Sequence, residues 1–99
     1  MKITITARHF ELTEPLKTRL EKKVLKLEKI SNQIIDAHII LEETGSRATA
    51  EVVLHSKSYD LRAQAKSYDM YTACENVVKK IRHQVRTHEE KIKHHKYKG

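Results

Sequence analysis

The chain has 99 residues, enough for one domain with a single hydrophobic core. Charged residues make up 33% and hydrophobic residues 38%, with two glycines and one proline, a composition that excludes long flexible linkers. A single cysteine excludes an internal disulfide, and no apolar run reaches the roughly 18 residues that a membrane-spanning helix needs.

The net charge of +7 is distributed unevenly. Residues 76–99 hold eight Lys or Arg against two acidic residues, whereas residues 1–75 hold twelve against eleven. The basic segment also carries a regular apolar stripe, which places the charge on a folded helix and not on a loose tail. Such a charge on a rigid element predicts a polyanionic partner.

A short strand is predicted at the N-terminus. Ile3 and Ile5 alternate with Thr4 and Thr6, a β-branched pattern that ends near Arg8. This alternation differs from the continuous apolar segment of a signal peptide, so we expect a cytoplasmic protein.

An amphipathic helix is predicted over residues 14–29. Thr13 is a suitable N-cap, and Pro15 is tolerated in the first turn. Apolar residues then recur at spacings of four, four and three. They are Leu16, Leu20, Val24 and Leu27.

Three more strands follow. Residues 34–42 are β-branched and apolar, which indicates a buried central strand. Residues 47–55 and 59–66 alternate strictly between small or apolar and polar side chains. Ala63 and Ala65 in the last strand leave room for a packed helix.

The last element is a long helix that begins near Asp69, a good N-cap. Its apolar stripe consists of Met70, Cys74, Val77, Ile81, Val85, His88 and Ile92. The predicted order is β-α-β-β-β-α, with the last three strands in an antiparallel meander. We predict an α+β two-layer sandwich, a four-stranded sheet with two helices packed on one face. One domain spans residues 1–95, followed by a short basic tail over 96–99.

Basic side chains gather on one side of each predicted helix. At 100° per residue, a sector of about 80° on the first helix contains Arg19, Lys22, Lys26 and Lys29. A sector of about 60° on the second helix contains Lys79, Arg82, Arg86 and Lys93. Simple solvation of an exposed face explains the first sector equally well, but few acids relieve the repulsion in the second. Both outward sides belong to one surface, for which nucleic acid is the leading partner class.

Other interpretations of these features are weaker. No membrane partner is expected, because the apolar helix face is needed for the core and no exposed Trp or Phe wedge is present. Tyr71, at the start of the second helix, packs at the helix edge or stacks on a base, and packing is favoured.

The histidines do not form a metal-ligand pattern. His83 and His88 are five residues apart, about 140° around a helix, and His94 and His95 lie among lysines. His88 falls on the apolar stripe and is expected to be packed, and Cys74 is expected to be an ordinary buried thiol. We therefore predict no metal site, no cofactor and no enzymatic activity, since no phosphate-binding Gly-rich loop or Ser-His-Asp arrangement is present either.

Short segments spread over nearly the whole chain carry a family resemblance. They are Ile3-Thr4-Ile5-Thr6, Glu11-Leu12-Thr13-Glu14, Lys26-Leu27-Glu28, Asp69-Met70-Tyr71-Thr72-Ala73, Lys80-Ile81-Arg82-His83-Gln84-Val85, His88 and Lys91-Ile92-Lys93. In this order and spacing they resemble the short form of bacterial hibernation promoting factor, in the ribosome-associated inhibitor and sigma-54 modulation protein family. The β-α-β-β-β-α fold of that family agrees with the order derived above.

The resemblance implies binding to the small ribosomal subunit and its 16S rRNA, at the decoding channel. Occupancy would exclude mRNA and tRNA and inhibit translation under stress or in stationary phase. The rRNA contacts carried over by position are Arg8, Lys22, Lys26, Lys29, Lys79, Arg82, Arg86, Lys91 and Lys93.

The resemblance also bears on partners. It implies cooperation with a separate small ribosome modulation factor, and the protein is expected to be a monomer off the ribosome. Because the chain ends at Gly99, we expect no additional C-terminal domain and no self-driven dimerisation of ribosomes.

Two further functions stay open. A general double-stranded RNA-binding protein also places two helices on a sheet, although its usual order is α-β-β-β-α. A protein-interaction adaptor for acidic partners predicts binding that survives ribonuclease treatment.

Overall fold

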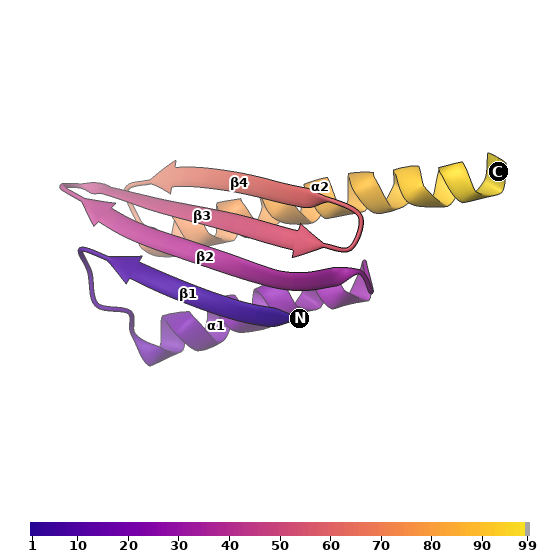
Figure 1. Ribbon diagram of the computed structural model, residues 1–99. Helices are drawn as coiled ribbons and strands as arrows, with labels where there is room; N and C mark the ends of the chain where they lie inside the picture. Colours follow the sequence, from indigo (N-terminus) through magenta and orange to yellow (C-terminus); the bar gives the residue numbers. More distant parts are fainter. Residues whose placement is uncertain (99) are drawn as a thin grey trace.

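A four-stranded sheet and two helices make up the fold (Figure 1). The computed structural model describes the backbone of residues 1–98 and the side chains of residues 1–92. In chain order the elements are β1 (Lys2–Arg8), α1 (Glu14–Leu25), the 3-10 helix η1 (Lys26–Lys29), β2 (Ile34–Thr44), β3 (Arg47–Ser56), β4 (Asp60–Ser67) and α2 (Met70–Lys98). This order confirms the predicted β-α-β-β-β-α arrangement.

The strands are ordered β1-β2-β3-β4 across the sheet. As predicted, β2, β3 and β4 form an antiparallel meander. β1 pairs with β2 in parallel, because α1 carries the chain back along the sheet between the two strands. One row of facing apolar residues crosses all four strands: Ile5, Ile39, Val52 and Ala63.

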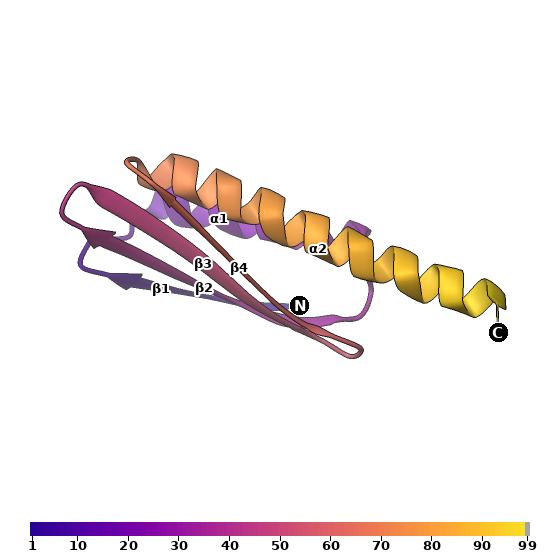
Figure 2. The same ribbon diagram turned by 90° about the horizontal axis from the view of Figure 1, so that it is seen from above.

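Both helices cover the same face of the sheet, which confirms the two-layer prediction (Figure 2). Leu20 and Val24 of α1 and Val77 and Ile81 of α2 are buried between the layers, each at most 1% exposed. The other face of the sheet carries no helix among the residues that the structure describes. β2 is therefore central but covered on one side only, and Ile40 on its uncovered side is half-buried.

The predicted caps start both helices. The Thr13 hydroxyl accepts a hydrogen bond from the Leu16 backbone N–H at 3.4 Å. The Asp69 carboxylate accepts bonds from the backbone N–H and the hydroxyl of Thr72, both at 2.9 Å, and these bonds lower the pKa of Asp69. The α-helical part of α1 ends at Leu25, and the last predicted turn is tightened into η1.

α2 lies along the edge strand β4 and continues past the end of the sheet (Figure 2). Its side chains bind two carbonyl groups of β4. Lys80 Nζ donates to the Gln64 carbonyl oxygen at 2.8 Å, and Gln84 Nε2 donates to the Arg62 carbonyl oxygen at 3.2 Å. α2 therefore protects an edge that another strand could otherwise pair with. Within the described part of the chain, no helix is long and apolar enough to span a membrane.

Candidate nucleic-acid interface

A groove between the two helices gathers cations from both. Its lining residues are Lys23 of α1, Lys26 of η1, and Glu75, Val78, Lys79 and Arg82 of α2. The groove contains four basic side chains and one acidic side chain. The outward sides of the two helices thus meet in one basic surface.

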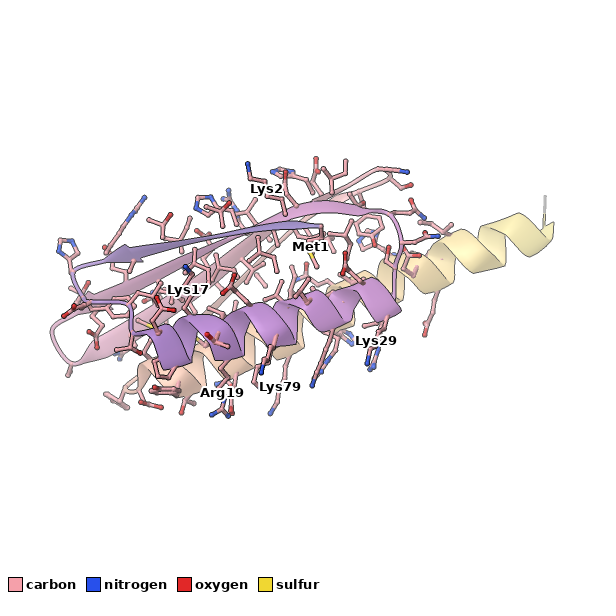
Figure 3. All side chains as sticks on the ribbon, turned by 90° about the horizontal axis from the view of Figure 1, so that it is seen from below. Met1, Lys2, Lys17, Arg19, Lys29 and Lys79 are labelled. Carbon is pink, nitrogen blue, oxygen red and sulfur yellow. The ribbon has the colours of Figure 1, made fainter. Side chains whose placement is uncertain are left out.

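The surface lies on the side of the molecule away from the sheet. Figure 3 shows Arg19, Lys29 and Lys79 projecting from the helical layer, whereas Lys2 lies on the opposite side, at the sheet. The charge is consequently carried by elements that the hydrophobic core holds in fixed positions.

Lys23 is a groove residue that sequence reasoning missed. It follows Leu16 by seven residues, so the helical count places it about 20° from the apolar stripe and outside the basic sector. In the structure it is half-buried and lines the groove. A lysine can cover apolar surface with its aliphatic stem and keep its ammonium group in water. A lysine at the edge of an apolar stripe facing a second helix is the signal that could have found it.

One ion pair bridges the helices beside the groove. Arg19 Nη2 lies 2.7 Å from Glu75 Oε1. Both side chains are partly exposed, so the pair contributes at most about 1 kcal/mol to stability. The ion pair also offsets the negative charge that Glu75 presents to the groove, because Arg19 binds this carboxylate from outside the lining.

Six of the nine predicted RNA contacts lie on this helical side. Lys26, Lys79 and Arg82 line the groove itself. Lys22 and Lys29 are exposed on α1 and η1. Arg86 is exposed on α2, one turn beyond Arg82 and in the same sector. That these residues bind RNA remains a prediction.

Of the other three predicted contacts, Arg8 and Lys91 are not brought to the groove. The alternation of β1 places Arg8 with Thr6 on the uncovered face of the sheet, where Thr6 Oγ1 hydrogen-bonds His38. Lys91 is exposed but lies about 140° around α2 from Arg86. The side chain of Lys93 lies outside the described residues.

His88 and His55 have local structural partners. His88 stacks on Tyr59 with ring centroids 4.9 Å apart, which confirms the prediction that it is packed. His55 Nδ1 lies 2.9 Å from Asp60 Oδ1, and this hydrogen bond raises the pKa of His55. Among the residues with described side chains, no three His, Cys, Asp or Glu groups come together as metal ligands would.

Cys74 and Tyr71 lie where the start of α2 packs against α1. Burial raises the pKa of the Cys74 thiol to about 11, so the thiol is protonated near neutral pH and is a poor nucleophile. Tyr71 lines a small hollow together with Leu16 and Leu20 of α1 and is 44% exposed. The hollow therefore contains no activated thiol.

The groove is suited to binding. Lys and Arg side chains on rigid helices can contact successive phosphate groups of a nucleic acid backbone. The described residues around it supply no activated nucleophile and no pair of acids placed for proton transfer.

Comparison with known proteins identifies the family. The family model described as "Sigma 54 modulation protein / S30EA ribosomal protein" matches residues 3–93. The ribosome hibernation promoting factor of Escherichia coli K12 is 30% identical over 95 residues, covering 96% of this chain and 100% of that protein. The ribosome hibernation promotion factor of Lactococcus lactis is 32% identical over 95 residues, covering 93% of this chain and 51% of that protein.

A solved structure has the same fold. The crystal structure of the N-terminal domain of Thermus thermophilus Protein Y has a TM-score of 0.82 and 25% identity, covering 88% of this chain and 98% of that chain. Sequence and fold agree over almost the full length, and the chain belongs to the Sigma 54 modulation protein / S30EA ribosomal protein family.

Proposed function

We propose that this protein is a ribosome hibernation factor that binds the 16S rRNA of the small ribosomal subunit at the decoding channel. Family membership supports the ribosome-associated role and a cytoplasmic location. The cationic groove between α1 and α2 is the observation that carries the RNA-binding mechanism. The bound protein would exclude mRNA and tRNA by occupying their space, without any catalytic step.

The arrangement of the groove supports site selection by shape, with its cations contacting phosphate groups. Phosphate contacts fix position but carry no sequence information, so specificity must come from the shape of the folded RNA. Val78 packs into the core beneath the groove at 4% exposed, and this packing holds the two rows of cations at one spacing. An RNA channel of matching width is then preferred over a regular duplex.

The proposal includes two statements about assembly. The protein is a monomer off the ribosome, which sedimentation velocity measures directly. A separate small modulation factor pairs the idle ribosomes, so the protein alone leaves them as monomers in a sucrose gradient.

The first experiment is co-sedimentation of the protein with purified ribosomal subunits over a salt series. We expect it to pellet with the small subunit, to be released as salt rises, and to be displaced by mRNA with initiator tRNA. Equal binding to both subunits, or equal affinity for an isolated RNA duplex, would favour a general double-stranded RNA-binding protein. Binding that survives ribonuclease would favour a protein-interaction adaptor.

A triple variant tests whether the helical face binds RNA. Reversing Lys79, Arg82 and Arg86 to Glu should lower affinity for the small subunit by about 100-fold or more, because three attractive phosphate interactions become repulsive. All three side chains lie outside the core, so circular dichroism and the melting temperature should stay close to wild type. Wild-type binding by the folded variant would refute the helical face as the RNA-binding surface.

A further inference from the structure

A buried carboxylate lies on the basic helix α2. Glu89 is 9% exposed, on a segment otherwise rich in Lys and Arg. Its Oε2 atom accepts two hydrogen bonds, from the Ser31 hydroxyl at 3.0 Å and from the Tyr59 hydroxyl at 2.7 Å. A buried carboxylate is unfavourable unless its donors are in place. The positions of the two hydroxyl groups therefore fix where Glu89, and with it this part of α2, can lie.

The two donors come from turns that are themselves held together. Ser31 lies between η1 and β2, and Tyr59 lies between β3 and β4. The Lys57 backbone N–H donates to the Gln33 carbonyl oxygen at 3.0 Å, which joins the two turns. The Ser31 hydroxyl also accepts a bond from the Gln33 backbone N–H at 3.1 Å. The donors thus form a rigid socket for Glu89.

Aromatic stacking adds a second grip on the helix. The Tyr59 ring stacks on His88, the neighbour of Glu89, with an interplanar angle of 24°. The Tyr59 backbone N–H in turn donates to the Ser56 hydroxyl at 2.9 Å, which fixes the tyrosine within its turn. Two consecutive residues of α2 are therefore held by one side chain.

The grip lies where α2 passes the turn between β3 and β4, at one end of the sheet, and α2 continues beyond that end (Figure 2). Beyond Glu89 the helix continues to Lys98, and its sequence there includes four lysines. Nine residues of helix extend about 14 Å, so a tilt of about 10° at Glu89 would displace the end by about 2 Å. A displacement of this size is enough to remove charged groups from hydrogen-bonding distance of phosphates.

We propose that Ser31, Tyr59 and Glu89 form a positioning latch that aims the basic end of α2 at RNA without touching the RNA. The inference rests on the proposed function, because it concerns how that RNA is engaged. Glu89 is then a positioning residue, a buried acidic side chain on a helix that we propose binds RNA.

The test uses the double variant Ser31→Ala and Tyr59→Phe. It removes both hydroxyl donors and keeps the ring that stacks on His88. We expect amide hydrogen exchange to accelerate about tenfold or more from residue 86 onward, with the amides of β2 and β3 unchanged. The slope of log affinity for the small subunit against log salt should fall by about one for each phosphate group that the variant no longer reaches.

Ile39→Val is the matched control. It removes one buried methyl group from the middle of the sheet and lowers stability without altering the latch. Its salt slope should equal that of the wild-type protein. If the double variant does not fold, Tyr59→Phe alone replaces it, because this variant still removes one of the two hydroxyl donors to Glu89.

The outcomes separate the latch from the proposed function. A double variant with wild-type affinity and salt slope overturns the latch, even where its helix end exchanges faster. Unchanged exchange beyond residue 86 also overturns it. Failure of the wild-type protein to bind the small subunit overturns the proposed function itself, and the aiming role with it.

Discussion

Lys79 and Lys80 are neighbours in the sequence with different surroundings. Lys79 lines the groove between the helices, whereas Lys80 Nζ donates to the Gln64 carbonyl oxygen of β4. The same charge is therefore available to RNA at one position and bound to the edge of the sheet at the next. Helical geometry explains the difference, because consecutive residues point about 100° apart.

This contrast predicts that one substitution changes binding and the other changes stability. Lys79→Ala should weaken binding to the small subunit and lower the salt slope by about one, with stability unchanged. Lys80→Ala should leave binding unchanged and lower the free energy of unfolding by up to about 1 kcal/mol, since it removes one exposed hydrogen bond. Fluorescence-based binding and urea unfolding measure the two effects. An equal decrease of affinity in both variants would mean that charge, and not position, decides binding.

His55 makes stability depend on pH in a defined direction. Its hydrogen bond to Asp60, assisted by the charge of Asp36, raises the pKa of His55 above the ordinary value of 6.5. A raised pKa in the folded state means that the pair stabilises the fold fully below pH 6.5 and ceases to do so as pH rises through the folded-state pKa.

Asp60→Asn tests this pH dependence. Relative to wild type, the variant should be least stable below pH 6.5 and equally stable at higher pH, measured by thermal unfolding. The imidazole NMR titration midpoint of His55 should fall toward 6.5. A stability difference that grows with rising pH would contradict the assignment.

At the scale of elements, local signals predicted most of the fold. The caps Thr13 and Asp69 act within three residues, and strict alternation in β3 and β4 shows directly which side chains face the helices. These features depend on neighbours in sequence, so sequence alone contains them. The pairing of β1 with β2 could not be predicted in this way, because parallel strands are joined through a helix and their register is set by packing.

The sequence predicted those residues of the candidate site whose positions follow from helical periodicity. Periodicity found the basic sectors, but it excluded Lys23, which is half-buried and lines the groove. Arg8, in contrast, is a predicted contact that lies away from the groove. The alternation that packs Ile3 and Ile5 against the core places Arg8 on the other face, so the RNA contact that the family resemblance implies for Arg8 stays a prediction. Glu89 was not recognisable, because its partner Ser31 is 58 residues away.

The whole molecule has two faces with different electrostatics. On the uncovered face of the sheet, two basic groups have an acidic neighbour, Arg62 with Glu51 and His9 with Glu42, each 3.7 Å apart. On the helical face, cations outnumber acids in the groove by four to one. Such an asymmetry would orient the protein toward the RNA proposed above, because the helical face would release more counterions on binding than the sheet face.

A pair of charge reversals on opposite faces separates orientation from net charge. Lys26→Glu and Arg8→Glu change the net charge by the same amount, and both side chains are exposed. At physiological salt, screening over about 8 Å confines each effect to its own surroundings. Lys26→Glu should therefore reduce binding to the small subunit strongly, by about tenfold or more, and Arg8→Glu should have little effect. An equal reduction in both would show that the protein responds to total charge, and a larger reduction in Arg8→Glu would place the RNA on the open sheet.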